Sequence, residues 1–117
     1  MRVPRCLIVD DSAAFRDAAR AMLERGGFAV VGAAADAAEA VRLTEELHPD
    51  VALVDVDLGA DSGFDVAGLL NDEHCDVAVI LTSTHDEQDF SDLVAASPAR
   101  AFLPKLTLTA QAIRDLL

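Results

Sequence analysis

The stretch Val51-Ala52-Leu53-Val54-Asp55, four apolar residues followed by a carboxylate, decides the fold of this chain. The same arrangement recurs on either side of it, at residues 6–9 before Asp10-Asp11, 77–81 before Thr82-Ser83 and 101–104 before Lys105. Continuous apolar runs are typical of strands that are buried on both faces, as in a parallel sheet between layers of helices. Because the carboxyl ends of parallel strands meet at one edge, we expect the polar residues to lie together there.

Strand and helix patterns alternate along the whole chain. Strands are predicted at residues 5–10, 28–33, 51–56, 77–81 and 99–103. Helices are predicted from Ser12 to Gly26, from Asp36 to Leu47, over 63–70, around 90–94 and from Leu108 to Leu116, with a loop at 57–62 and a polar turn at 71–75. This order predicts an α/β protein with a doubly wound, five-stranded parallel sheet and helices on both faces, a (βα)5 arrangement.

The composition predicts a single domain over residues 1–117 with an aliphatic core, since hydrophobic residues make up 52% and aromatic residues 4%. A net charge of −12 argues against direct binding of nucleic acid or an anionic membrane, which both require basic surfaces. No apolar run approaches the ~18 residues of a membrane span. The two cysteines, Cys6 and Cys75, do not make a disulfide framework. We therefore expect a cytoplasmic protein.

Three carboxylates at the predicted edge of the sheet indicate a cation site. A single acid after the first strand would serve as a helix cap, but Asp10 and Asp11 are adjacent, and Asp55 ends the central strand. Like charges crowded at one edge repel by about 1 kcal/mol or more per close pair, which a cation would relieve. Hard oxygen ligands favour Mg²⁺. One of the three is then a candidate nucleophile toward phosphorus.

Lys105 and Thr82 fit the same chemistry. Lys105 is the only lysine in the chain, and an ammonium group is a strong partner for phosphate or carboxylate. The hydroxyl of Thr82 could bond a phosphoryl oxygen, although a polar strand end alone would explain it.

These residues in this order resemble the receiver domain of bacterial two-component response regulators, over the whole chain. The resemblance rests on Asp10-Asp11, Asp55, Thr82, Phe102 and Lys105, and on the loop from Asp55 to Gly63. It implies a flavodoxin-like fold and a histidine kinase or phosphotransfer protein that donates a phosphoryl group to Asp55. It also implies Mg²⁺ held by Asp11, Asp55 and the main-chain carbonyl of Asp57, with Asp10 nearby.

The resemblance further implies a switch. Lys105 would pair with Asp55 or the phosphoryl group, Thr82 would move to bond that group, and Phe102 would turn inward. The face of the fourth helix, fifth strand and closing helix would then change its partners, a second copy being one candidate. The chain departs from the family pattern at Gly59 and Leu106, where proline is usual, and at Phe102, where tyrosine is common. Without that proline, the cis or trans state of the Lys105–Leu106 bond stays open.

Two alternatives remain. A small phosphatase of the haloacid dehalogenase type fits Asp55-Val56-Asp57, Thr82 and Lys105, but leaves Asp10-Asp11 unexplained and lacks a further acidic motif after the lysine. A receiver-like interaction module that is never phosphorylated has no need of the complete acidic set. The receiver interpretation is favoured, and it predicts that the domain is not an enzyme apart from gaining and losing its own phosphoryl group. Both a stand-alone regulator and a part of a longer one fit the sequence.

Overall fold

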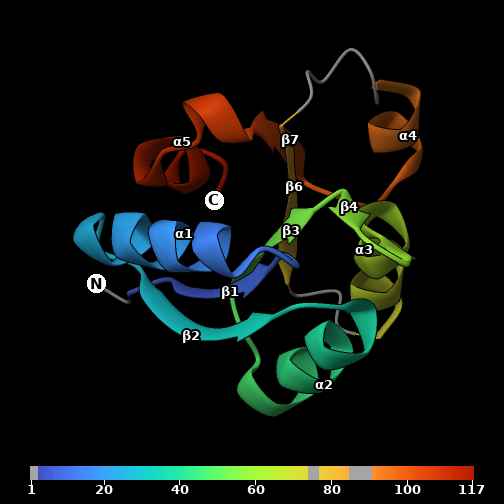
Figure 1. Ribbon diagram of the computed structural model, residues 1–117, viewed down its shortest axis with the longest axis horizontal. Helices are drawn as coiled ribbons and strands as arrows, with labels where there is room; N and C mark the ends of the chain where they lie inside the picture. Colours follow the sequence, from blue (N-terminus) through green and yellow to red (C-terminus); the bar gives the residue numbers. More distant parts are fainter. Residues whose placement is uncertain (1–2, 74–76, 85–90) are drawn as a thin grey trace.

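A five-stranded parallel sheet forms the centre of the protein, shown as a computed structural model in Figure 1. The structure describes residues 3–73, 77–84 and 91–117. The strands are β1 (Arg5–Val9), β2 (Ala29–Ala34), β3 (Val51–Asp55), β6 (Ala78–Ser83) and β7 (Ala101–Pro104), in the order β2-β1-β3-β6-β7. The chain passes from β1 to one edge of the sheet and then returns to build the other side. This doubly wound topology confirms the predicted fold.

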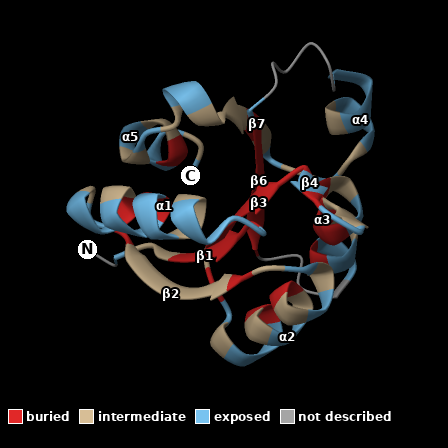
Figure 2. Ribbon diagram, viewed as in Figure 1, coloured by how far each residue is buried: buried red, intermediate tan, exposed pale blue. Residues whose placement is uncertain are grey.

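Helices cover both faces of the sheet. The helices α1 (Ala13–Arg25) and α5 (Ala110–Arg114) lie on one face, and α2 (Ala37–Leu47), α3 (Gly63–Glu73) and α4 (Ser91–Ala96) on the other (Figure 1). In β1, Cys6 and Ile8 belong to the buried cluster under α1 and α5, whereas Leu7 and Val9 belong to the opposite cluster. Both faces of the strand are therefore buried, as Figure 2 shows for the central strands. This two-sided burial explains the uninterrupted apolar runs.

Two helices begin at the N-caps that the sequence predicts. The Ser12 side chain accepts a hydrogen bond from the Phe15 N–H at 3.2 Å, and the Asp36 side chain accepts one from the Glu39 N–H at 2.9 Å. The Glu39 carboxylate in turn accepts from the Ala35 N–H, which completes a reciprocal capping arrangement. These caps fix the residue at which each helix begins after the preceding strand.

Several boundaries differ from the prediction. The helix α3 continues to Glu73, because the polar residues Asn71 and Asp72 lie on its exposed side and do not form a turn. The predicted loop at 57–62 contains a small antiparallel hairpin, β4 (Asp57–Leu58) and β5 (Asp61–Ser62), turned by Gly59 with φ of 74°. Residues 74–75 of the predicted turn and Phe90 lie outside the described residues.

The segment that follows β7 also differs from the prediction. A 3-10 turn, η2 (Lys105–Thr107), follows β7, and the Thr109 side chain caps α5 by accepting from the Ala112 N–H at 3.0 Å. The closing helix therefore begins after Thr109 and not at Leu108, since a capping hydroxyl defines its first turn. Across the described ranges, no helix combines the length and the apolar character needed to cross a membrane.

Candidate functional site

Three carboxylates meet at the carboxyl edge of the sheet. Asp10 follows β1, Asp11 is its neighbour, and Asp55 ends the central strand β3. One oxygen from each lies within 4.8 Å of the other two. Asp10 is fully buried and Asp55 nearly so, whereas Asp11 is exposed. The cluster is therefore open to solvent through Asp11 and closed below by the sheet.

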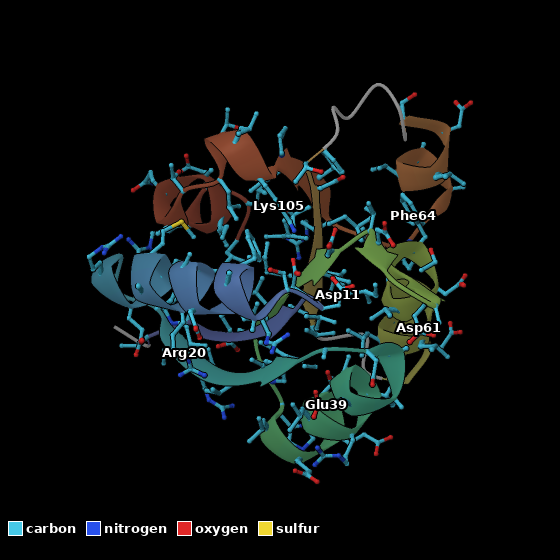
Figure 3. All side chains as sticks on the ribbon, in the orientation of Figure 1. Asp11, Arg20, Glu39, Asp61, Phe64 and Lys105 are labelled. Atoms are coloured by element: carbon cyan, nitrogen blue, oxygen red, sulfur yellow. The ribbon has the colours of Figure 1, made fainter. Side chains whose placement is uncertain are left out.

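Lys105 extends from the end of β7 into this cluster. Its Nζ atom donates to Asp10 Oδ2 at 2.8 Å and to Asp55 Oδ2 at 3.3 Å. Lys105 and Asp11 are labelled in Figure 3, where both lie near the end of β3. The side chain of Lys105 is only 14% exposed, so both ion pairs lie largely out of bulk water. The only lysine of the chain therefore pairs with two carboxylates of the acidic cluster.

The surroundings shift two ionisation equilibria. Burial raises the pKa of Asp55 above its ordinary value; the charge of Asp10 also raises it, while the Asp57 N–H bond and Lys105 oppose the shift. For Lys105, burial lowers the pKa, but the hydrogen bond to Asp10 and the charges of Asp55 and Asp10 outweigh it, so the net shift is upward. Lys105 therefore stays charged, and Asp55 is a more basic carboxylate than a solvated one.

Asp10 accepts hydrogen bonds through its carboxylate and through its main-chain carbonyl. Its Oδ1 atom accepts from the Ser12 N–H at 2.8 Å, its Oδ2 atom accepts from Lys105, and its carbonyl oxygen accepts from Arg16 Nη1 at 2.7 Å. Because both of its carboxylate oxygens are engaged, Asp10 is suited to fix Lys105 and the start of α1. Asp55 also accepts two hydrogen bonds, from the Asp57 N–H and from Lys105, but both are longer, at 3.3 Å, and Asp11 is exposed.

Thr82 provides a hydroxyl beside Asp55. The two residues are register partners on the neighbouring strands β6 and β3. The Thr82 Oγ1 atom is fully buried and has no hydrogen-bond partner within the described part of the chain. An unpaired buried hydroxyl costs about 1–3 kcal/mol, which an incoming oxygen atom would recover. The Thr82 hydroxyl is therefore a donor on the strand beside Asp55 that no described group uses in this structure.

Phe102, Asp57 and Lys105, which were also predicted at the site, and the nearby Thr84 differ in how far they are buried. Phe102 lies on β7 and is 6% exposed, packed in the cluster under α2 and α3. Asp57 is exposed on β4, where its N–H donates to Asp55 Oδ1 at 3.3 Å. Thr84 is exposed just beyond the end of β6. The Lys105–Leu106 bond is trans, and the Leu106 side chain is 92% exposed.

The loop after Asp55 needs a glycine for a steric reason. A Cβ atom on Gly63 would lie 2.1 Å from the Asp55 carbonyl oxygen and 2.7 Å from the Val56 Cα atom. The Gly63 N–H donates to the Val56 carbonyl at 2.9 Å, which draws the start of α3 against the end of β3. Gly63 therefore allows the close approach that gives the Asp55 segment its geometry.

Sequence reasoning missed two contacts, one in the loop that follows Asp55 and one at Lys105. The Asp61 carboxylate accepts from the Ala37 N–H at 3.1 Å and so ties the β4–β5 hairpin to the first turn of α2. The Phe15 ring centroid lies 4.1 Å from Lys105 Nζ. Its helical spacing marks Phe15 as a core residue only. An aromatic residue in the first turn after an acidic pair is the signal that could have drawn attention to it.

The chain belongs to the response regulator receiver domain family, whose pattern matches residues 6–116. It is 33% identical over 101 residues to the transcriptional regulatory protein PdtaR of Mycobacterium tuberculosis, covering 86% of this chain and 49% of that protein. It resembles the signal receiver domain of the response regulator NarL from the same organism, with a TM-score of 0.86, 32% identity, and 98% and 96% of the two chains covered.

A third relative adds a ligand-bound example. A response regulator from Burkholderia pseudomallei, with a phosphorylated aspartic acid, a calcium ion and citrate, has a TM-score of 0.84 and 25% identity, covering 97% of this chain and 66% of that one. The chain spans about half the length, or less, of the first curated relatives that it matches. Its class is that of phosphoacceptor domains in two-component signalling.

Proposed function

We propose that Asp55 is the phosphoacceptor of this domain. The observation that supports this most is the buried Thr82 hydroxyl, which has no hydrogen-bond partner in the described part of the chain and lies on the strand beside Asp55. In addition, the Lys105 ammonium lies 3.3 Å from the Asp55 Oδ2 atom. In the transfer, a bond forms between an Asp55 carboxylate oxygen and phosphorus, and the bond between phosphorus and the donor nitrogen breaks. The nitrogen keeps the electron pair and takes up a proton. The donor is a phosphohistidine of a histidine kinase or a phosphotransfer protein.

Mg²⁺ is the proposed cofactor, because the donor set consists of hard oxygens and one side is open. Asp11 and Asp55 would hold the ion, together with the main-chain carbonyl of Asp57, and Asp10 would act through water. Bound Mg²⁺ would neutralise charge on the phosphoryl oxygens. The Burkholderia relative contains a phosphorylated aspartic acid and a calcium ion, which supports a phosphorylated aspartate and a divalent cation in this fold.

The other side chains position and sense the phosphoryl group. Lys105 exchanges its Asp55 contact for a phosphoryl oxygen while it keeps Asp10. Thr82 donates its hydroxyl to another phosphoryl oxygen. Phe102 is buried here, so the proposed switch is between this inward rotamer and an outward one. Phosphorylation then biases a two-state equilibrium through local contacts.

The proposed output surface comprises α4, β7 and α5. Over its described residues, Ser91–Ala96, the helix α4 contains no buried residue, so little packing free energy holds this part in place. This face is also the proposed contact for a second copy of the domain. With a net charge of −12, the domain is not expected to bind nucleic acid itself.

Intact-protein mass spectrometry tests the assignment. Incubation with acetyl phosphate and Mg²⁺ should add one phosphoryl group to the wild-type protein and none to Asp55→Asn. A phosphoryl adduct that persists in Asp55→Asn would sink the assignment. Steady release of phosphate from a phosphomonoester would instead favour the phosphatase alternative, because the proposed domain turns over no external substrate.

A further inference from the structure

Asp10, Ser12, Phe15 and Lys105 contact one another in sequence, so that the contacts form a closed ring at the site. Asp10 Oδ1 accepts from the Ser12 N–H at 2.8 Å, and Ser12 Oγ accepts from the Phe15 N–H at 3.2 Å. The Phe15 ring centroid lies 4.1 Å from Lys105 Nζ, which returns to Asp10 Oδ2 at 2.8 Å. The acid that holds Lys105 thus also sets the helix turn that places the ring over it.

The Phe15 ring attracts the Lys105 ammonium in a different way from the two carboxylates. Asp10 and Asp55 attract the ammonium but also attract any cation that enters the cluster. The quadrupole of an aromatic ring attracts the ammonium without offering an oxygen ligand to a metal ion. When the phosphoryl group replaces the Asp55 contact, the ring and Asp10 remain to hold the ammonium in place.

We propose that Phe15 is a positioning residue, which holds the Lys105 ammonium beside the acceptor carboxylate through its aromatic face. The inference rests on the proposed role of Asp55. Phe15 touches no reacting atom in this structure; it acts through Lys105. A cation–π contact at a partly desolvated site corresponds to a factor of roughly three to ten in rate, if it is fully used in the transition state.

The test combines a rate with a direct view of the lysine. Because Lys105 is the only lysine, isotope labelling of lysine gives side-chain NMR signals from this residue alone. Phe15→Leu keeps an apolar side chain but removes the ring, and Phe15→Tyr keeps the ring. Phe15→Leu should slow phosphoryl uptake from acetyl phosphate roughly three- to tenfold and remove the ring-current shift of the Lys105 εCH₂ signals. Phe15→Tyr should restore both.

Phe28→Leu is the matched control. Phe28 packs in the same buried cluster, and its ring lies 5.2 Å from the Arg114 Cζ atom, so this variant also removes a ring that faces a cation. It should lower the melting temperature but leave the uptake rate and the Lys105 signals at their wild-type values.

Three outcomes would overturn the inference. Phe15→Leu could phosphorylate at the wild-type rate, it could slow without any change in the Lys105 signals, or Phe15→Tyr could slow as much as Phe15→Leu. A wild-type protein that takes up no phosphoryl group would refute the proposed function instead. In that case the Lys105 signals would still report whether the ring lies over the ammonium.

Discussion

Replacing Gly63 by alanine should damage the site and the fold together. The added Cβ atom would lie 2.1 Å from the Asp55 carbonyl oxygen, so the backbone must move by about 1 Å to reach even the 3.0 Å that real Cβ atoms respect. No rotamer change relieves this contact, because the opposing atoms belong to the main chain. Overpacking of this kind costs about 1–3 kcal/mol. For a domain of this size the melting temperature should fall by roughly 4–12 °C.

The same displacement moves Asp55, the proposed acceptor carboxylate. A misplacement of about 1 Å can slow an oriented reaction by up to ~100-fold, so phosphoryl uptake should fall more than stability alone would explain. Gly68→Ala is the matched control, since Gly68 lies on the same helix and an added Cβ atom there meets no atom within 4 Å. Alanine should stabilise that position by about 0.5–1 kcal/mol and leave uptake unchanged.

Thermal unfolding followed by circular dichroism and uptake rates by mass spectrometry would measure both effects. The reasoning fails if the two alanine variants have similar melting temperatures. It also fails if Gly63→Ala loses stability but phosphorylates at the wild-type rate below its melting temperature, since the close approach would then not position Asp55.

Three further changes probe the acidic cluster. Asp11→Ala should abolish Mg²⁺ binding in calorimetry, because it removes a proposed ligand. The melting temperature without Mg²⁺ should be kept or raised, because the change also removes a like charge. An unchanged affinity for Mg²⁺ would contradict this. The pKa of Asp55 is raised, so its stabilising contribution is complete below its unfolded value of 3.8 and is lost as the pH rises through the folded value. Asp55→Asn should therefore gain melting temperature relative to wild type as the pH rises above about 4, and a difference that does not change with pH would refute it. Substitution of Asp57 or Thr84, both exposed at the mouth of the site, should alter the rate of dephosphorylation but not uptake, which a decay time course checks.

The fold was predictable because each strand carries its own evidence of burial. Neighbouring residues of β1 alternate between the two buried clusters, and both must be apolar, so an apolar run indicates two covered faces directly. The first polar residue marks the end of β1 and β3 to within one residue, but β6 continues through Thr82 to Ser83. The length of α3 did not follow, because Asn71 and Asp72 are as compatible with an exposed helix face as with a turn.

The candidate site was predictable only as a set of charges at one edge. Asp10, Asp55 and Lys105 each follow an apolar run, and parallel topology brings such residues together. Their pairing depends on distances that no spacing encodes: Lys105 lies closer to Asp10 than to Asp55. The contact of Phe15 with Lys105 depends in addition on the N-cap at Ser12, which sets the rotation of α1.

The charge balance at this edge of the sheet supports the proposed switch. Three carboxylates and one ammonium leave a net charge of about −2, which a divalent cation would cancel. The proposed phosphorylation of Asp55 would replace one carboxylate charge by about −1.5 to −2, so the cluster would gain negative charge even with the cation in place. Hydrogen-bond donors would then move toward the new oxygens. The buried hydroxyl of Thr82 has no other partner in the described part of the chain, so its movement sacrifices no existing hydrogen bond. Thr82 lies on β6, between β3 and β7, so in the proposed switch a shift of its side chain would reach Phe102 and the proposed output surface.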